Sequence, residues 1–368
     1  MQKPILAISV LCLAAQAASP ADFQYQETTQ MTGGSALAAM KMAGTFSKAA
    51  RQATDPTVSS VYIQGNRMAR VSPLSTEIID LDNRTITNID HSRKQYTVMT
   101  FEQLKRQMEL AAARMQSEQA KQKPSSLPND TRMDFAVKVR ETGAEKDISG
   151  VPAKEAILNL TLTASSTKSS DTGALAMTND MWMAADIPGY AAVRAFYTRY
   201  SAEMGAMVGE SVSRSMAAMP AGMGEGMAAM MKEVSRLKGV PILQIMRIGT
   251  SINGEPLPAA SEAPLPDSGG STPSGSDVAK SVGSAAAASA LKGLAGGLGG
   301  FGGFGRSKKP KEDAPTAGSG VAPGAAGATG YAVLMENRTE ITGFSSAAID
   351  PSKFQHPAGY KQIVIQDK

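Results

Sequence analysis

The long run rich in Gly, Ala, Ser and Pro between residues 253 and 329 constrains the fold of this chain more than any other feature. It has no periodic apolar pattern that could bury a core, so we predict a disordered loop. Strand patterns flank it: "GVPILQIMRIG" (239–249) precedes it and "YAVLMENRTEITGF" (331–344) follows it. We therefore expect these two segments to form the arms of one β-hairpin, with the loop inserted at its tip.

An insertion of this kind costs little free energy. Closing a loop of roughly seventy-five residues instead of about four costs only ~2.5 kcal/mol of chain entropy. The last segment is therefore predicted to belong to the sheet, as an edge or closing strand that Phe354, Pro357 and Tyr360 fasten. The folded domain would then be discontinuous and comprise residues 18–252 and 330–368.

The start of the chain has the pattern of an export signal. Lys3 supplies the positive charge, and residues 5–15 form an apolar stretch that is too short to span a bilayer. Ala15-Gln16-Ala17 matches a cleavage site for signal peptidase. We predict that residues 1–17 are a signal peptide cleaved near Ala17, and that the mature protein is periplasmic or associated with the outer envelope.

Several functional classes lack the residues that they need. The only cysteine, Cys12, lies within the predicted signal, so the mature chain would have no thiol for a disulfide, a metal or nucleophilic catalysis. The chain has two histidines and no H-E-x-x-H, G-x-S-x-G or G-K-[ST] motif. Its net charge is only +4 with scattered Lys and Arg, which argues against a nucleic-acid partner. We therefore predict a protein that is not an enzyme, with no catalytic residues, no cofactor and no metal site.

Periodicity predicts an α+β domain. Thr100 and Gln103 form the pattern of a capping box, which would open a helix that runs to about residue 123. Further helical patterns begin near Gly189 and span 211–237. Alternating apolar and polar residues predict an antiparallel sheet of eight to ten strands, within the segments 22–31, 58–71, 75–100, 133–142, 154–165, 179–188, 238–252 and 331–344.

The order of these segments resembles a known family. The segments are "VYIQGNRMARV", "IIDLDNRTITNIDHSRKQYTVMTFEQL", "DISGVPAKEAILNL", "MWMAADIP", "KGVPILQI" and "ITGFSSAAIDPSKFQHPAGYK". In this order they resemble an exported bacterial family of unknown function whose domains are similar to the LolA/LolB-type lipoprotein carriers. The resemblance implies a curved antiparallel sheet, a half-barrel, whose concave face is covered by helices. It also implies binding of acyl chains or other apolar ligands, and it brings no catalytic residues with it.

Aromatic and methionine side chains are the candidate ligand-binding residues. The aromatic residues near position 190 follow helical spacing, which is typical of a core helix and equally of a helix that lines a pocket beside the core. Trp182 lies just before them, and Met108 occupies the apolar face of the helix that begins at Thr100. The residues predicted to line the ligand site are Met108, Trp182, Tyr190, Phe196, Tyr200, Met204 and Met207.

A second stripe of methionines leaves three interpretations open. Met216, Met219, Met223, Met227 and Met230 recur every three or four residues. They could pack a helix on the sheet, form a pliable surface for a variable ligand, or bind Cu(I) through their thioethers.

The sequence therefore supports two functional hypotheses. The first is a periplasmic, non-catalytic binder or carrier of a lipid, an acyl chain or another apolar ligand, held between sheet and helices. The alternative is a scaffold protein of the cell envelope that uses its long loop to contact partners. In residues 291–311, Leu and Phe recur among glycines before a basic cluster, a pattern that would suit contact with a membrane or with a protein.

Overall fold

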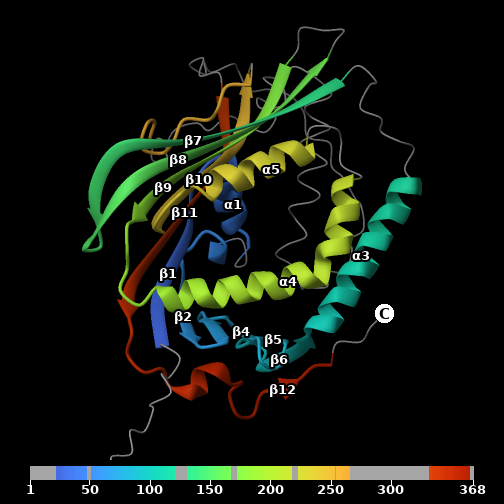
Figure 1. Ribbon diagram of the computed structural model, residues 1–368, viewed down its shortest axis with the longest axis vertical. Coiled ribbons are helices and arrows are strands. Elements are labelled where there is room, and N and C mark those ends of the chain that lie inside the picture. The colour runs from blue at the N-terminus through green and yellow to red at the C-terminus, as the bar shows by residue number, and fades with distance from the viewer. Residues whose placement is uncertain are drawn as a thin grey trace, which may run out of the picture.

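The computed structural model describes residues 22–47, 51–121, 131–166, 172–217, 223–252, 254–265 and 331–364 (Figure 1). The predicted signal peptide, residues 1–17, lies outside these ranges. The helices are α1 (Ser35–Gly44), α3 (Phe101–Lys121), α4 (Ala191–Ala217) and α5 (Met223–Val234), with a short 3-10 helix η1 (Pro351–Phe354). The strands are β1 (Asp22–Gly33), β2 (Thr57–Gln64), β3 (Arg67–Val71), β4 (Ser75–Asp80), β5 (Thr85–Asp90), β6 (Gln95–Thr100), β7 (Thr131–Ile148), β8 (Val151–Ser166), β9 (Thr172–Ala184), β10 (Val240–Ile252), β11 (Tyr331–Ser345) and β12 (Lys361–Gln362).

The strands form one open sheet in the order β12-β6-β5-β4-β3-β2-β1-β11-β10-β9-β8-β7. The α+β class is confirmed, but the sheet has twelve strands rather than eight to ten. It is also mixed, because β12 runs parallel to β6 while the other neighbours are antiparallel. Strand β12 spans only Lys361–Gln362, which is too short to show an alternating pattern in the sequence.

The predicted hairpin around the long loop is present. Strand β10 pairs with β11 in antiparallel register from Leu243–Glu340 to Ser251–Tyr331. However, β11 is not an edge strand, because its other side pairs with β1 from Gln24–Ser345 to Gly33–Glu336. Alternation along one strand reveals its two faces and not how many neighbours it has, so the sequence did not show this central position.

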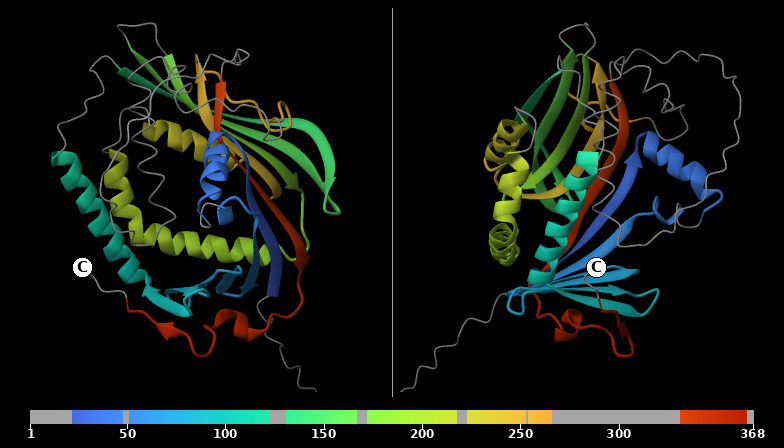
Figure 2. Two further views of the ribbon diagram at one scale, coloured as in Figure 1. Left: turned by 180° about the vertical axis from the view of Figure 1, so that it is seen from behind. Right: turned by 90° about the vertical axis from the view of Figure 1, so that its right-hand side faces the viewer.

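The helices lie on different sides of the sheet. Figure 1 shows α4 and α5 inside the bend of the sheet, while α3 extends away from β6. The right panel of Figure 2 shows α1 on the other side of β1 and β11 from α4 and α5. We call the side that carries α5 the inner face of β7–β11 and the opposite side the outer face.

Two apolar clusters hold the fold together. The larger one includes Phe23, Ile63, Phe101 and Phe196, all fully buried between the sheet and α4. The smaller one joins strands β3–β5 to the C-terminal segment. Phe354 of this segment is buried in the cluster, and the partly buried Tyr360 packs against the cluster. The sequence had suggested that the C-terminal aromatics fasten β11. In the structure they instead cover strands β3–β5.

The predicted start of α3 is confirmed in atomic detail. The backbone N–H of Thr100 donates to Oε1 of Gln103 at 2.9 Å, and the N–H of Gln103 donates to Oγ1 of Thr100 at 3.1 Å. This reciprocal pair is the capping box, which satisfies two donors that a helix start leaves open.

The predicted loop 253–329 is ordered at its beginning. Residues 254–265 pack on the outer face of the sheet, and Leu257 and Ala259 are buried there. Their backbone groups bond to buried side chains of the sheet, a source of order that composition cannot reveal. We call this segment the strap. The rest of the loop lies outside the described residues, and no helix within the described ranges is long and apolar enough to cross a membrane.

Candidate functional site

The aromatic residues of α4 pack tightly on the main core. The Phe196 and Tyr200 rings are stacked with centroids 6.2 Å apart, and Tyr200 meets the edge of Phe101 at 6.4 Å. Just before the helix, Tyr190 contacts Phe23 edge to face at 5.8 Å. Because these rings fill the space between α4 and β1–β2, they serve as core. Burial raises the pKa of the Tyr190 and Tyr200 hydroxyls, since the phenolate form would lose its hydration.

The other predicted ligand-binding residues do not all join this group. Met204 packs against the same core, but Met108 is 41% exposed on α3. Trp182 of β9 is 6% exposed and belongs to the main buried cluster, and the ammonium of Lys146 stands 3.7 Å from its ring centroid. The side chain of Met207 lies outside the described residues. Trp182, Tyr190, Phe196, Tyr200 and Met204 thus lie in or against one buried cluster, and only Met108 of the described side chains is separate from it.

Of the methionine stripe, only the side chain of Met230 lies within the described residues. Met219 and the side chains of Met216, Met223 and Met227 lie outside the described residues. Met230 is half-buried on α5. The three interpretations of the stripe therefore stay open.

The inner face of the sheet carries a row of apolar side chains that crosses five strands. Cross-strand partners continue from β7 through β8, β9 and β10 to β11. Every member is partly exposed, which is unusual for apolar residues in the middle of a large sheet. We call this set the apolar row; its members are Val137, Leu160, Met177, Ile248 and Met335.

Apolar neighbours widen the row, and α5 covers one end of it. Phe135, Leu162 and Leu175 form the adjacent line of cross-strand partners. Helix α5 packs on β7, and Gly226 lies so close to Phe135 that an added Cβ would stand 2.0 Å from its ring. The glycine therefore lets α5 sit directly on the apolar surface beside the row.

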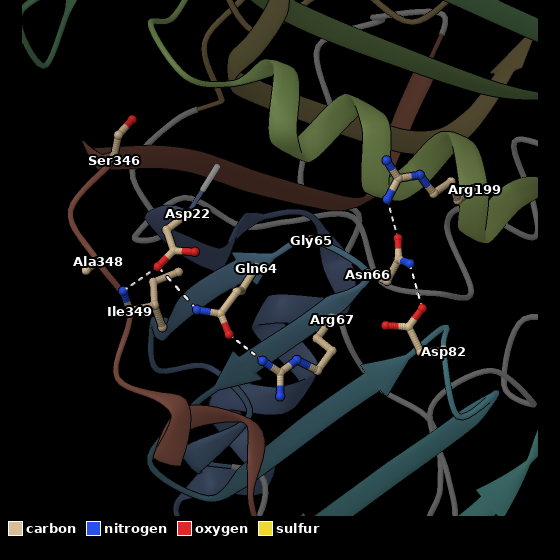
Figure 3. Close-up of a pocket in the computed structure, with 10 residues that line it drawn as sticks. All are labelled: Asp22, Gln64, Gly65, Asn66, Arg67, Asp82, Arg199, Ser346, Ala348 and Ile349. Atoms are coloured by element: carbon tan, nitrogen blue, oxygen red, sulfur yellow. Dashed lines mark hydrogen bonds between the residues drawn. The ribbon is translucent and has the colours of Figure 1, made fainter. Parts of the chain in front are cut away.

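A polar pocket of about 890 Å³ lies between the β2–β3 turn, α4 and the segment that follows β11 (Figure 3). It is lined by Asp22, Gln64, Gly65, Asn66, Arg67, Asp82, Arg199, Ser346, Ala348 and Ile349. The backbone N–H of Ile349 donates to Oδ2 of Asp22 at 2.7 Å, and Asn66 donates to Oδ1 of Asp82 at 2.6 Å.

The charged groups of this pocket hold segments of the protein together. Arg199 of α4 donates to Asn66 in the β2–β3 turn, and Arg67 donates to Gln64 (Figure 3). All four charged side chains drawn there thus have protein partners. The pocket joins β1, the β2–β3 turn, α4 and the segment after β11, so we interpret it as structural.

A buried ion pair anchors the strap to the outer face. Arg247 is 1% exposed, and its Nε donates to Oε2 of Glu336 at 2.7 Å. One guanidinium nitrogen of Arg247 also donates to the carbonyls of Pro258, Ala259 and Ala263 at 3.0, 3.0 and 2.8 Å. Because all of these strap carbonyls accept from one arginine, its charge is well compensated.

A pair of buried carboxyl groups lies beside this anchor. Asp180 accepts from the backbone N–H of Ser261 in the strap at 3.0 Å, and Glu155 accepts from the hydroxyl of Thr142. Oδ1 of Asp180 and Oε1 of Glu155 have no other partner within the described residues. Burial raises the pKa of Asp180, and the neighbouring Glu155 raises it further through its charge and hydrogen bond. A carboxyl group that keeps its proton here can supply the missing hydrogen bond.

Sequence reasoning did not identify the apolar row, the strap anchor or the carboxyl pair. The row depends on the register of five strands, which the sequence does not give. A signal for the anchor was present, because Arg247 is the only charged residue of a largely apolar strand. In the described part of the chain, no group of three or more His, Cys, Asp or Glu side chains could hold a metal ion.

No family model matches this chain, and no curated protein matches it. The resemblance to the LolA/LolB-type carriers therefore stays a prediction.

Proposed function

We propose that this protein is an exported, non-catalytic binder or carrier of an apolar ligand such as a lipid or an acyl chain. The observation that carries the proposal is the apolar row on the inner face of β7–β11, whose side chains are all partly exposed. An acyl chain that lies along these side chains would gain roughly 0.8 kcal/mol for each CH₂ group that it buries. Two thioethers in the row, those of Met177 and Met335, would adapt to chains of different shape.

The proposed site differs from the one suggested by the sequence. The rings of Phe196 and Tyr200 already fill the space under α4, so the ligand would lie on β7–β11 beside α5. We further propose that the bent sheet with helices inside the bend is a half-barrel of the LolA/LolB type. Exchange of the ligand would require α5 to move away from the β7 edge of the inner face.

The first test is native mass spectrometry of the mature chain, purified gently from its own envelope and then extracted with organic solvent. We expect a stoichiometric amphiphile that leaves in the extract. A mass equal to that of the bare chain, with no increase when lipid is added, would contradict the proposal and favour the scaffold alternative.

A matched pair of variants locates the ligand. Met177→Gln keeps the length of the side chain but places an amide in the middle of the apolar row, so the affinity for a fluorescent fatty acid should fall about tenfold or more. The thermal midpoint should change little, because Met177 is partly exposed. Lys138→Gln places the same amide on the other face of β7, next to Val137, and should bind as the wild type does.

A further inference from the structure

The C-terminal turn of α1 presents two large apolar side chains to solvent. Phe46 is 95% exposed and Met42 is 71% exposed. The backbone N–H groups of Phe46 and Ser47 both donate to the carbonyl of Ala43, at 3.1 and 2.9 Å, so the helical turn continues past Gly44. Met42 and Phe46 are four positions apart in this turn and therefore point to the same side.

The chain segment that carries this apolar pair is basic. From residue 28 to residue 54 the sequence contains no Asp or Glu, and it contains Lys41, Lys48 and Arg51. Exposed Arg51 donates through Nε and a terminal nitrogen to the carbonyl of Gly44, which keeps its charge beside the turn. Large exposed apolar side chains in a segment that has basic and no acidic residues are the pattern of a surface that contacts anionic lipid.

The turn stands on a rigid base. Leu37 is buried on the opposite side of α1. Gly34, which begins the helix with φ of 91°, lies so close to β11 that an added Cβ would stand 2.5 Å from the carbonyl oxygen of Leu334. Helix α1 is therefore fixed to β1 and β11, on the other side from α4 and α5 (Figure 2). The pair therefore lies on the side of α1 that faces away from the buried Leu37.

We propose that Met42 and Phe46 insert into the surface of an anionic lipid bilayer, with Lys41 and Arg51 at the level of the headgroups. The partner is a membrane rather than a protein, because every charged residue among the twenty-seven residues 28–54 is basic. This inference goes beyond the proposed function, since it concerns the docking of the protein and not its ligand. It also lies outside the segment 291–311, in which the sequence suggested membrane contact.

The test is sedimentation of the full mature chain with vesicles of phosphatidylglycerol and phosphatidylethanolamine. The wild type should bind them, bind vesicles of pure phosphatidylcholine much more weakly, and be released as the salt concentration rises. The double variant Met42→Ser/Phe46→Ser should partition at least about tenfold more weakly. Both side chains are exposed, so the fold and the thermal midpoint should stay as in the wild type.

Leu74→Ser is the matched control. Leu74 is a large apolar residue that is 59% exposed in the turn between β3 and β4. Its replacement by serine should leave vesicle binding unchanged. Undiminished binding by the double variant would overturn the proposal. The proposal would also be overturned if the wild type formed dimers without lipid while the double variant stayed monomeric, because the pair would then serve self-association.

Discussion

At the scale of single residues, the carboxyl pair under the strap has the clearest chemical consequence. Asp180 lies in the sheet with a raised pKa, so the folded state binds a proton that the unfolded chain releases at a lower pH. A raised carboxyl pKa stabilises the fold at low pH, and this contribution is lost as the pH rises from about 4 through the pKa of the folded state. The strap should therefore be held most weakly in alkaline solution.

Asp180→Asn should remove this pH dependence. The amide oxygen can still accept from the backbone N–H of Ser261, and the amide nitrogen can donate to Glu155 in place of the shared proton. At pH 8 the variant should be roughly 1–3 kcal/mol more stable than the wild type, and the gain should shrink toward pH 4. Denaturant unfolding at a series of pH values measures the difference between the two proteins.

Asp186→Asn is the control for this change. Asp186 is exposed six residues further along the chain, so its substitution should leave the stability at each pH close to that of the wild type. If the free energies of unfolding of Asp180→Asn and the wild type differed by the same amount at all pH values, the Asp180–Glu155 pair would not hold a proton.

At the scale of secondary-structure elements, the contact of α5 with the sheet depends on one residue without a side chain. Gly226→Ala would place a methyl carbon 2.0 Å from a ring carbon of Phe135. Helix α5 would then have to move away from β7. We expect a loss of roughly 1–3 kcal/mol in stability and greater exposure of the inner face, seen as increased binding of a hydrophobic dye.

Gly205→Ala provides the comparison for the α5 contact. Gly205 is an exposed glycine in the middle of α4, and an added Cβ there would meet no atom within 4 Å. This variant should be slightly stabilised, because alanine favours a helix by roughly 1 kcal/mol over glycine. Equal behaviour of the two variants would argue against the tight contact at Gly226.

The positions of strands and helices along the chain were easier to predict than the pairing of the strands in the sheet. Alternation located β2, β7 and β8, a continuous apolar run located β10, and the Thr100 capping box located the start of α3 within one residue. These features depend on residues that are close in the sequence. The central position of β11 and the order of the strap depend on contacts between distant residues, such as the pairing of Gly33 with Glu336. For the same reason the candidate site moved from the α4 aromatics to the apolar row.

At the scale of the whole molecule, the loop and the strap should differ in their importance for stability. Ala263 of the strap and Tyr331 of β11 line the same small pocket, so a short linker can replace residues 266–328. This deletion should leave the thermal midpoint within a few degrees of the wild type, since loop closure costs little.

Deleting residues 254–328 should have a much larger effect. It removes the three carbonyls that accept from Arg247 and the donor to Asp180, which leaves buried polar groups without partners. We expect a loss of at least roughly 3 kcal/mol, measured by denaturant unfolding. Equal stability of the two deletions would show that the strap is dispensable.

The place of β11 also governs the order in which the molecule can be assembled. A chain grows from its N-terminus, and β1 then has β2 on one side and an open edge on the other. The strand that closes this edge begins only at Tyr331, after nearly the whole chain has been made. Until then, β1–β6 and β7–β10 are two half-sheets without a common neighbour. Completion of the native sheet is therefore a late event that follows synthesis, and a chain that stops before residue 331 leaves β1 and β10 as additional open edges at which it can aggregate.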